Sequence, residues 1–114
     1  MTEEPVASGE ILWRRIHRSH FQQGRVISAA FKDPKMSVDV ASVRLDMSTT
    51  MTDTSVGVSA LACSDAVAEG QSVVWDPITG NEAHALVVGE KPPSVARALR
   101  DASIFTHRDE IEAD

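Results

Sequence analysis

Apolar and polar positions alternate with a period of two along several short stretches of the chain, which is typical of strands with one buried face. In the first of them, Leu12, Arg14 and Ile16 share one side. The other side carries Trp13 and Arg15. From patterns of this kind we expect about six short strands, at residues 10–17, 26–31, 36–43, 56–62, 72–75 and 83–88.

Turn signals divide these strands into two hairpins. The sequence KDPK at 32–35 predicts a turn between the second and third strands, because proline fixes φ and Asp33 can bond to the backbone. The sequence DPITGN predicts a turn between the last two strands. Residues 44–55 are rich in Ser, Thr and Asp and are expected to form a loop with one helical turn.

Two helices are expected. The sequence CSDAVAEG predicts a short helix with Ser64 as its N-cap and Gly70 beyond its end. Two prolines and Ser94 open a longer helix near the C-terminus. Its apolar stripe follows helical spacing and consists of Val95, Ala98, Leu99 and Ala102.

The fold class is therefore α+β, a mostly antiparallel sheet covered by a C-terminal α-helix. A chain of 114 residues is one domain. We assign residues 1–9 to a flexible acidic arm, 10–106 to a single α+β domain and 107–114 to an acidic tail. An unpaired outer strand of so short a sheet could pair with a second copy as a homodimer.

The composition favours a cytoplasmic protein. No apolar run approaches the roughly 20 residues that span a bilayer, and the N-terminus is acidic where a signal peptide would be basic. The single cysteine, Cys63, suits a reducing compartment. We expect Cys63 to be a small buried residue and not a nucleophile, because no His, Lys or Arg lies near it in the sequence.

Charge is segregated along the chain although its formal net charge is −6. Residues 11–35 contain six bases and one acid, and residues 36–90 contain one base and eight acids. Residues 91–106 contain three bases and one acid. Basic surface is therefore expected near the first strand and the late helix.

Arg14 and Arg15 point to opposite sides of the first strand, so at least one of them is expected to be half-buried. A buried guanidinium needs a carboxylate, a phosphate or several carbonyls. An acid from the middle of the chain, such as Asp39, Asp46 or Asp76, could supply it. A carboxylate or phosphate of a ligand is the alternative, and simple solvation is a third.

Other chemistries have weaker support. Trp13 and Phe21 could stack on bases, but the acidic ends and middle of the chain disfavour nucleic acid. His17 and His20 resemble one half of a metal site, but no second pair of ligands lies nearby in the sequence, so no metal is expected. No cofactor is expected either. GEKPPS places Lys91 before the late helix, where helix N-termini favour anions, but it matches no known phosphate loop.

The segments LWRRI, SAAFKD, MSVDVA and AHALVVGEKPPSVARAL resemble, in this order, a family of small uncharacterised bacterial proteins. The resemblance covers most of residues 10–103 and implies a compact bacterial cytosolic domain, without supplying a reaction. His17 stands where that family tends to have proline, and Glu90 where it tends to have lysine. A site shared by the family would fall here on Arg14, Arg15, Ser28, Phe31, Asp33, His84 and Lys91.

Two functions follow. The first is a non-enzymatic binding or accessory module that holds an acidic protein segment or a small anionic ligand through Arg14, Arg15, Arg18 and Lys91. The second is a small nucleotide-handling or group-transfer enzyme with an arginine-lined pocket, in which the catalytic residues would be His84, Arg15 and Ser28. The enzyme requires these three side chains to meet in one cleft, whereas the module requires an exposed basic face.

Overall fold

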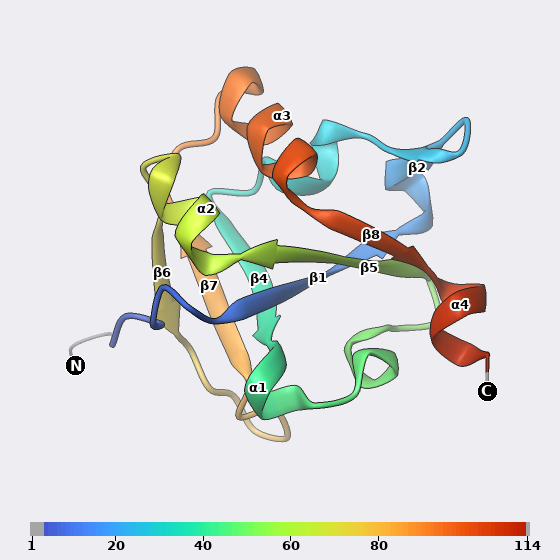
Figure 1. The fold of residues 1–114 in the computed structure, drawn as a ribbon, viewed down its shortest axis with the longest axis horizontal. Coiled ribbons are helices and arrows are strands. Elements are labelled where there is room, and N and C mark those ends of the chain that lie inside the picture. Colours follow the sequence, from blue (N-terminus) through green and yellow to red (C-terminus); the bar gives the residue numbers. More distant parts are fainter. Residues whose placement is uncertain (1–3, 114) are drawn as a thin grey trace.

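The computed structural model describes residues 4–113, which form a six-stranded sheet whose neighbouring strands are all antiparallel (Figure 1). In spatial order the strands are β6 (Ser72–Trp75), β7 (His84–Val88), β4 (Lys35–Val40), β1 (Ile11–His17), β5 (Ser55–Ala62) and β8 (Ile104–His107). Short strands β2 (Phe21–Gln22) and β3 (Arg25–Val26) form a separate two-stranded sheet. The predicted α+β class is confirmed.

The helices are short, apart from one. The α-helices are α1 (Ala41–Arg44), α2 (Cys63–Ala68), α3 (Pro93–Ala102) and α4 (Arg108–Glu112). The 3-10 helices are η1 (Arg18–His20), η2 (Ser28–Phe31) and η3 (Met47–Thr50). The helical turn expected within residues 44–55 is η3. Gly70 lies beyond the end of α2, as predicted, and its φ of 81° is typical of a glycine that ends a helix.

One face of the sheet forms the core. Leu12 and Ile16 of β1 are fully buried there, and they belong to the same cluster as Ala96 and Leu99 of α3. We call this side of the sheet the core face. The predicted stripe of α3 is only partly correct, because Ala102 is exposed and Ala96 takes part in its place.

The predicted strand at 26–31 is wrong. Residues 25–26 belong to β3, and Ser28–Phe31 form η2, which packs against α3. Ala30 and Phe31 are adjacent and both fully buried, which a helical turn allows and a strand with one buried face does not. The first predicted hairpin is wrong for the same reason, since β4 pairs with β1 and β7. The second hairpin is confirmed as β6 and β7.

Two further boundaries differ from the prediction. The strand expected at 36–43 ends at Val40, where the chain turns into α1. Ser64 lies inside α2, and the N-cap position belongs to Ala62, which makes no side-chain cap. Both changes occur where a strand passes directly into a helix without a polar residue to mark the joint.

The two ends of the chain have more structure than the arm and tail that the sequence suggests. Residues 1–3 of the expected arm lie outside the described residues. The Val6 N–H donates to Val73 O and the Trp75 N–H to Glu4 O, so residues 4–6 run along the outer edge of β6. Residues 104–112 form β8 and α4, which the sequence patterns did not indicate. Among the described residues, β8 is therefore the open edge of the sheet.

Within residues 4–113, none of the helices combines the length and the apolar character needed to cross a membrane.

Candidate functional site

Arg14 fills a gap between two strands. β1 and β4 are paired only at Leu12 with Val40 and at Trp13 with Asp39. Beyond these pairs, the Arg14 guanidinium donates from Nη1 to Ser37 O at 3.0 Å and from Nε to Ala30 O at 3.1 Å. The side chain therefore joins β1 to β4 and η2 through backbone carbonyls. Its partners are thus carbonyl groups and not a carboxylate.

Lys91 is buried in the joint between β7 and α3. Its side chain is 7% exposed, and Nζ donates to Val87 O at 2.8 Å and to Gly89 O at 3.1 Å. These two bonds leave one of the three ammonium donors without a partner among residues 4–113. A hollow of about 260 Å³, which we call the Lys91 hollow, is lined by Ser28, Ala29, Lys32, Lys91, Pro93 and Ala96.

Cations outnumber acids around the Lys91 hollow. Burial lowers the pKa of Lys91, Arg14 lowers it further, and the acid that opposes these effects is Asp33. Burial also lowers the pKa of Arg14, and Asp33 again acts in the opposite direction. Neither cation has a carboxylate within ion-pair distance among residues 4–113.

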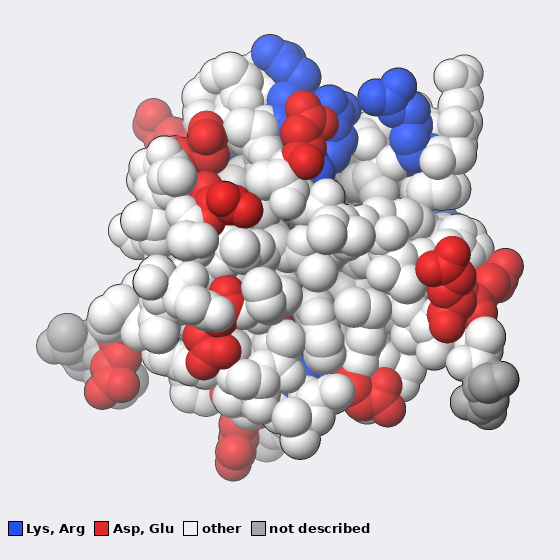
Figure 2. All heavy atoms as spheres, in the orientation of Figure 1, with Lys and Arg blue, Asp and Glu red and all other residues white. Residues whose placement is uncertain are grey.

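His20 lies near these cations and responds to their charge. Its pKa is lowered first by burial and then by Arg14, His17 and Lys32. Figure 2 shows Lys and Arg gathered at the end of the molecule that carries α3 and β2, with acidic atoms among them, whereas most Asp and Glu atoms are spread over the rest of that view. The sequence prediction of a basic surface near the late helix agrees with this distribution.

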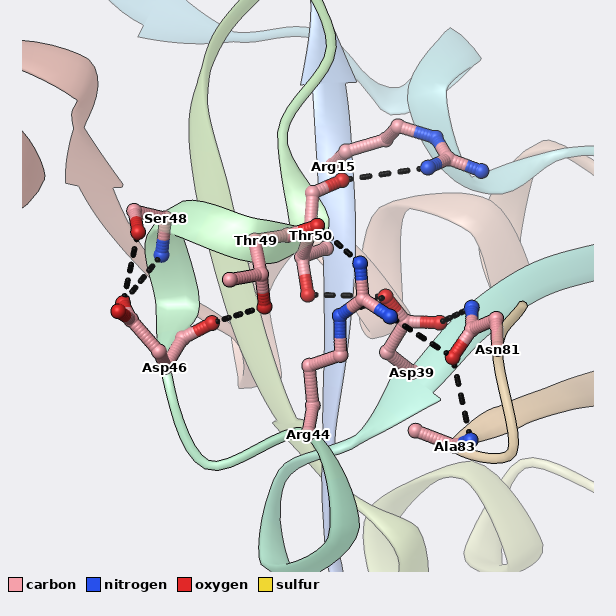
Figure 3. A network of polar contacts seen from close by, with 9 residues as sticks. All are labelled: Arg15, Asp39, Arg44, Asp46, Ser48, Thr49, Thr50, Asn81 and Ala83. Atoms are coloured by element: carbon pink, nitrogen blue, oxygen red, sulfur yellow. Dashed lines mark hydrogen bonds and ion pairs between the residues drawn. The ribbon is translucent and has the colours of Figure 1, made fainter.

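Arg15 and Arg18 do not join Arg14 and Lys91. Arg15 leaves β1 on the opposite side and donates from Nη1 to Thr50 O at 3.2 Å (Figure 3). Arg18 is an exposed residue of η1. Of the four predicted ligand-binding residues, the structure therefore brings together only Arg14 and Lys91.

Asp39 lies at the centre of a polar network that the sequence did not reveal (Figure 3). It is 3% exposed and accepts hydrogen bonds from Thr50 Oγ1 at 2.9 Å and from Asn81 Nδ2 at 2.8 Å. Arg44 Nε lies 3.7 Å from Asp39 Oδ2, and the same guanidinium donates to Asn81 Oδ1 and to Thr49 O. The network ties the 41–54 segment to β4 and to the loop that precedes β7.

The acids proposed as partners of Arg14 and Arg15 are used elsewhere. Asp39 pairs with Arg44, and Asp46 caps η3 by accepting from the Ser48 N–H. That part of the prediction is wrong. Arg44 is the one base among residues 36–90, and this isolation in an acidic stretch was the signal that could have identified it.

A larger hollow borders this network, but it has no unpaired positive charge among the described residues that line it. It has a volume of about 580 Å³ and is lined by Val43, Arg44, Thr49, Gly80, Asn81, Glu82 and Ala83. Its single cation, Arg44, is already bonded to the network, and Glu82 adds a negative charge. An anion therefore finds less support here than in the Lys91 hollow.

The residues of the enzyme hypothesis are separated. His84 is 8% exposed, and its Nδ1–H donates to Asp76 O at 2.9 Å, with Asp76 Oδ2 at 3.1 Å. His84 alternates with the core residue Ala85 and therefore lies on the face opposite the core face, whereas Ser28 lines the Lys91 hollow beside α3. Ser28 and His84 do not meet in one cleft.

Cys63 is fully buried, and burial raises the pKa of its thiol. Its Sγ lies 3.6 Å from Val6 O. This environment agrees with the small buried residue expected from the sequence. Within the described part of the chain, no three His, Cys, Asp or Glu side chains form a group that could hold a metal ion.

Comparisons of this chain with known protein families, with curated proteins and with solved structures gave no match.

Proposed function

We propose that this protein is a small binding module that holds an anionic ligand in the Lys91 hollow. The observation that carries the proposal concerns two cations, the half-buried Arg14 and the buried Lys91, which donate to backbone carbonyls and have no carboxylate within ion-pair distance among residues 4–113. Burying a charge without an opposite charge is costly, so a bound anion would relieve a penalty that the free protein carries.

The shape of the site favours a small ligand over an acidic protein segment. The Lys91 hollow of about 260 Å³ is close to the lower end of small-molecule sites. Lys32 at its rim and the Ser28 hydroxyl add a second charge and a hydrogen-bonding group. The ammonium groups of Lys32 and Lys91 at such a place suit carboxylate or phosphate groups, and the nearby charge of Arg14 acts in the same direction.

The enzyme hypothesis has no comparable support, because Ser28 and His84 lie on different sides of the sheet. We also keep the cytoplasm as the expected location, since the thiol of the single cysteine is buried and unpaired. The open edge of β8 is where a second copy would pair if the protein forms a homodimer.

Thermal unfolding with added anions tests the proposal. Inorganic phosphate, pyrophosphate and an oligoglutamate peptide are compared at one ionic strength set with sodium chloride. A ligand present at a hundred times its Kd adds about 2.7 kcal/mol to the free energy of unfolding, which raises the Tm by several degrees. We expect phosphate or pyrophosphate to stabilise the protein more than the peptide does.

The variant Lys32→Met should remove much of this stabilisation, and Lys35→Met serves as its matched control. Both lysines are exposed and both changes remove one positive charge, but only Lys32 lines the hollow. Equal loss of stabilisation in the two variants would mean that the anions act on overall charge. If oligoglutamate alone stabilised the protein, the ligand would be an acidic protein segment and not a small anion.

A further inference from the structure

Ser59, in the middle of β5, has a buried hydroxyl without a partner. The residue is 1% exposed, and its Oγ makes no hydrogen bond with any described residue. A buried hydroxyl without a partner is less favourable than a paired one. Buried polar atoms without a partner are rare in folded proteins, and a bound molecule or ion can satisfy them.

Ser59 lines a hollow that is separate from the Lys91 hollow. This second hollow, which we call the Ser59 hollow, has a volume of about 310 Å³. It is lined by Gly24, Arg25, Val26, Ser59, Arg100, Asp101, Ser103 and Phe105. It therefore lies between the β2–β3 turn and the C-terminal end of α3, and it shares no lining residue with the Lys91 hollow.

Two arginines give the Ser59 hollow a positive mouth. Arg100 donates from Nε to Asp101 Oδ1 at 2.9 Å, and its two Nη atoms make no hydrogen bond with another residue of the described chain. Arg25 is exposed, and its guanidinium is likewise without a hydrogen-bond partner among residues 4–113. The only acid that lines the hollow is Asp101, which already pairs with Arg100.

One wall of the hollow is aromatic. The Phe105 ring stacks on Phe21, with ring centroids 5.2 Å apart and an interplanar angle of 30°. Phe105 sits directly across from Ser59 in the β5–β8 pairing. An apolar wall, a polar floor and a cationic mouth are the features that orient a small ligand in a mostly preformed site.

We propose that the Ser59 hollow binds a small organic oxyanion. The carboxylate or phosphate group of the ligand meets Arg25 and Arg100, its apolar part lies against Phe105, and a polar atom bonds to the Ser59 hydroxyl. This is a second site, independent of the anion binding proposed for the Lys91 hollow. The volume of the hollow limits the ligand to a small molecule.

Isothermal titration of the full chain with benzoate and with phenyl phosphate tests this site. We expect saturable binding of at least one probe, and the better probe identifies carboxylate or phosphate as the preferred group. The change Ser59→Ala should raise the Kd roughly tenfold, because hydrogen bonds to charged or polar ligand groups contribute about 1.4 kcal/mol or more. Its Tm without probe should equal or exceed that of the wild type, because an unpaired hydroxyl has been removed.

Arginine variants complete the test. Arg25→Gln and Arg100→Gln should each weaken binding by roughly tenfold. Arg97→Gln is the matched control, because Arg97 is an exposed residue of α3 that does not line the hollow. Its Kd should stay within about twofold of the wild type.

Three results would overturn the proposal. The first is the absence of saturable binding of both probes, and the second is binding that Ser59→Ala leaves unchanged. The third is binding that Lys32→Met weakens and Arg25→Gln does not, since the probe would then occupy the Lys91 hollow. That third result would leave the proposed function intact while removing this second site.

Discussion

Arg14 and Ser59 are direct cross-strand partners on β1 and β5, and both side chains lie on the core face of the sheet. Leu12 and Ile16 flank Arg14 on β1 and are fully buried. A charged group and an unpaired hydroxyl thus interrupt an otherwise apolar surface. The Arg14 cation contributes to the electrostatics of the Lys91 hollow, and Ser59 forms part of the other hollow.

Replacing Arg14 with methionine should destabilise the protein by about 2–4 kcal/mol, because Ala30 O and Ser37 O would lose their donor. Methionine keeps much of the length and apolar contact of the arginine stem. Urea unfolding of Arg14→Met measures the cost. The exposed Arg18→Met is the control and should stay within about 0.5 kcal/mol of the wild type. Equal costs for the two variants would mean that the carbonyl bonds of Arg14 contribute nothing.

Gly57 should not tolerate a side chain. A Cβ at this position would meet the backbone oxygen of Thr106 and would lie 2.7 Å from the ring of Phe105. Gly57→Ala is therefore expected to cost at least about 2 kcal/mol, since the β5–β8 pairing must separate or the ring must move. Thermal unfolding checks this, with Gly9→Ala as the control because a Cβ at Gly9 meets nothing within 4 Å. A Gly57→Ala variant as stable as the control would show that β8 is loosely attached.

The sequence predicted the parts of the fold that depend on periodicity. The alternation around Arg14 placed it correctly on the side of Leu12 and Ile16, and the late helix is present as α3. The η2 turn was missed because a short apolar run such as VISAAF is compatible with a strand or a helical turn. Only the tertiary contact between η2 and α3 decides between them.

The polar sites were harder to predict than the fold. The pairing of Asp39 with Arg44 requires the chain to turn from β4 into α1 at Val40, and no capping residue marks that turn. Ser59 falls within a strand of small and apolar residues, where a buried serine has no sequence signature. Lys91 was named as a candidate because it precedes a proline-marked helix start, which is a local signal.

Asp39→Asn should destabilise the protein by about 2–4 kcal/mol. Asp39 now accepts hydrogen bonds from Thr50 Oγ1 and Asn81 Nδ2, and the NH₂ group of an asparagine would face one of these two donors. The substitution would also leave Arg44 without a counter-charge. Urea unfolding measures the loss, and the exposed Asp53→Asn is the control with the same change of charge. The double variant Asp39→Asn with Arg44→Met should cost less than the sum of the two single changes. Additive costs would mean that the ion pair is not coupled.

His20 reports on the cations around the Lys91 hollow. Burial and the charges of Arg14 and Lys32 hold its pKa below the ordinary value of 6.5. The unfolded chain therefore binds this proton more readily, so the contribution of His20 to stability is present above about pH 6.5 and is lost as the pH falls through its folded pKa. An NMR titration of the imidazole signals measures that pKa directly.

Removing a neighbouring positive charge should raise the pKa of His20. We expect an upward shift in Lys32→Met and a smaller one in Lys35→Met, because of these two lysines only Lys32 is among the charges that lower the pKa of His20. Inorganic phosphate bound in the Lys91 hollow should raise the pKa in the same direction, since an anion offsets the charge of Lys32 and Arg14. A pKa at or above 6.5 in the free protein, or equal shifts in the two lysine variants, would contradict the clustering of these cations around His20.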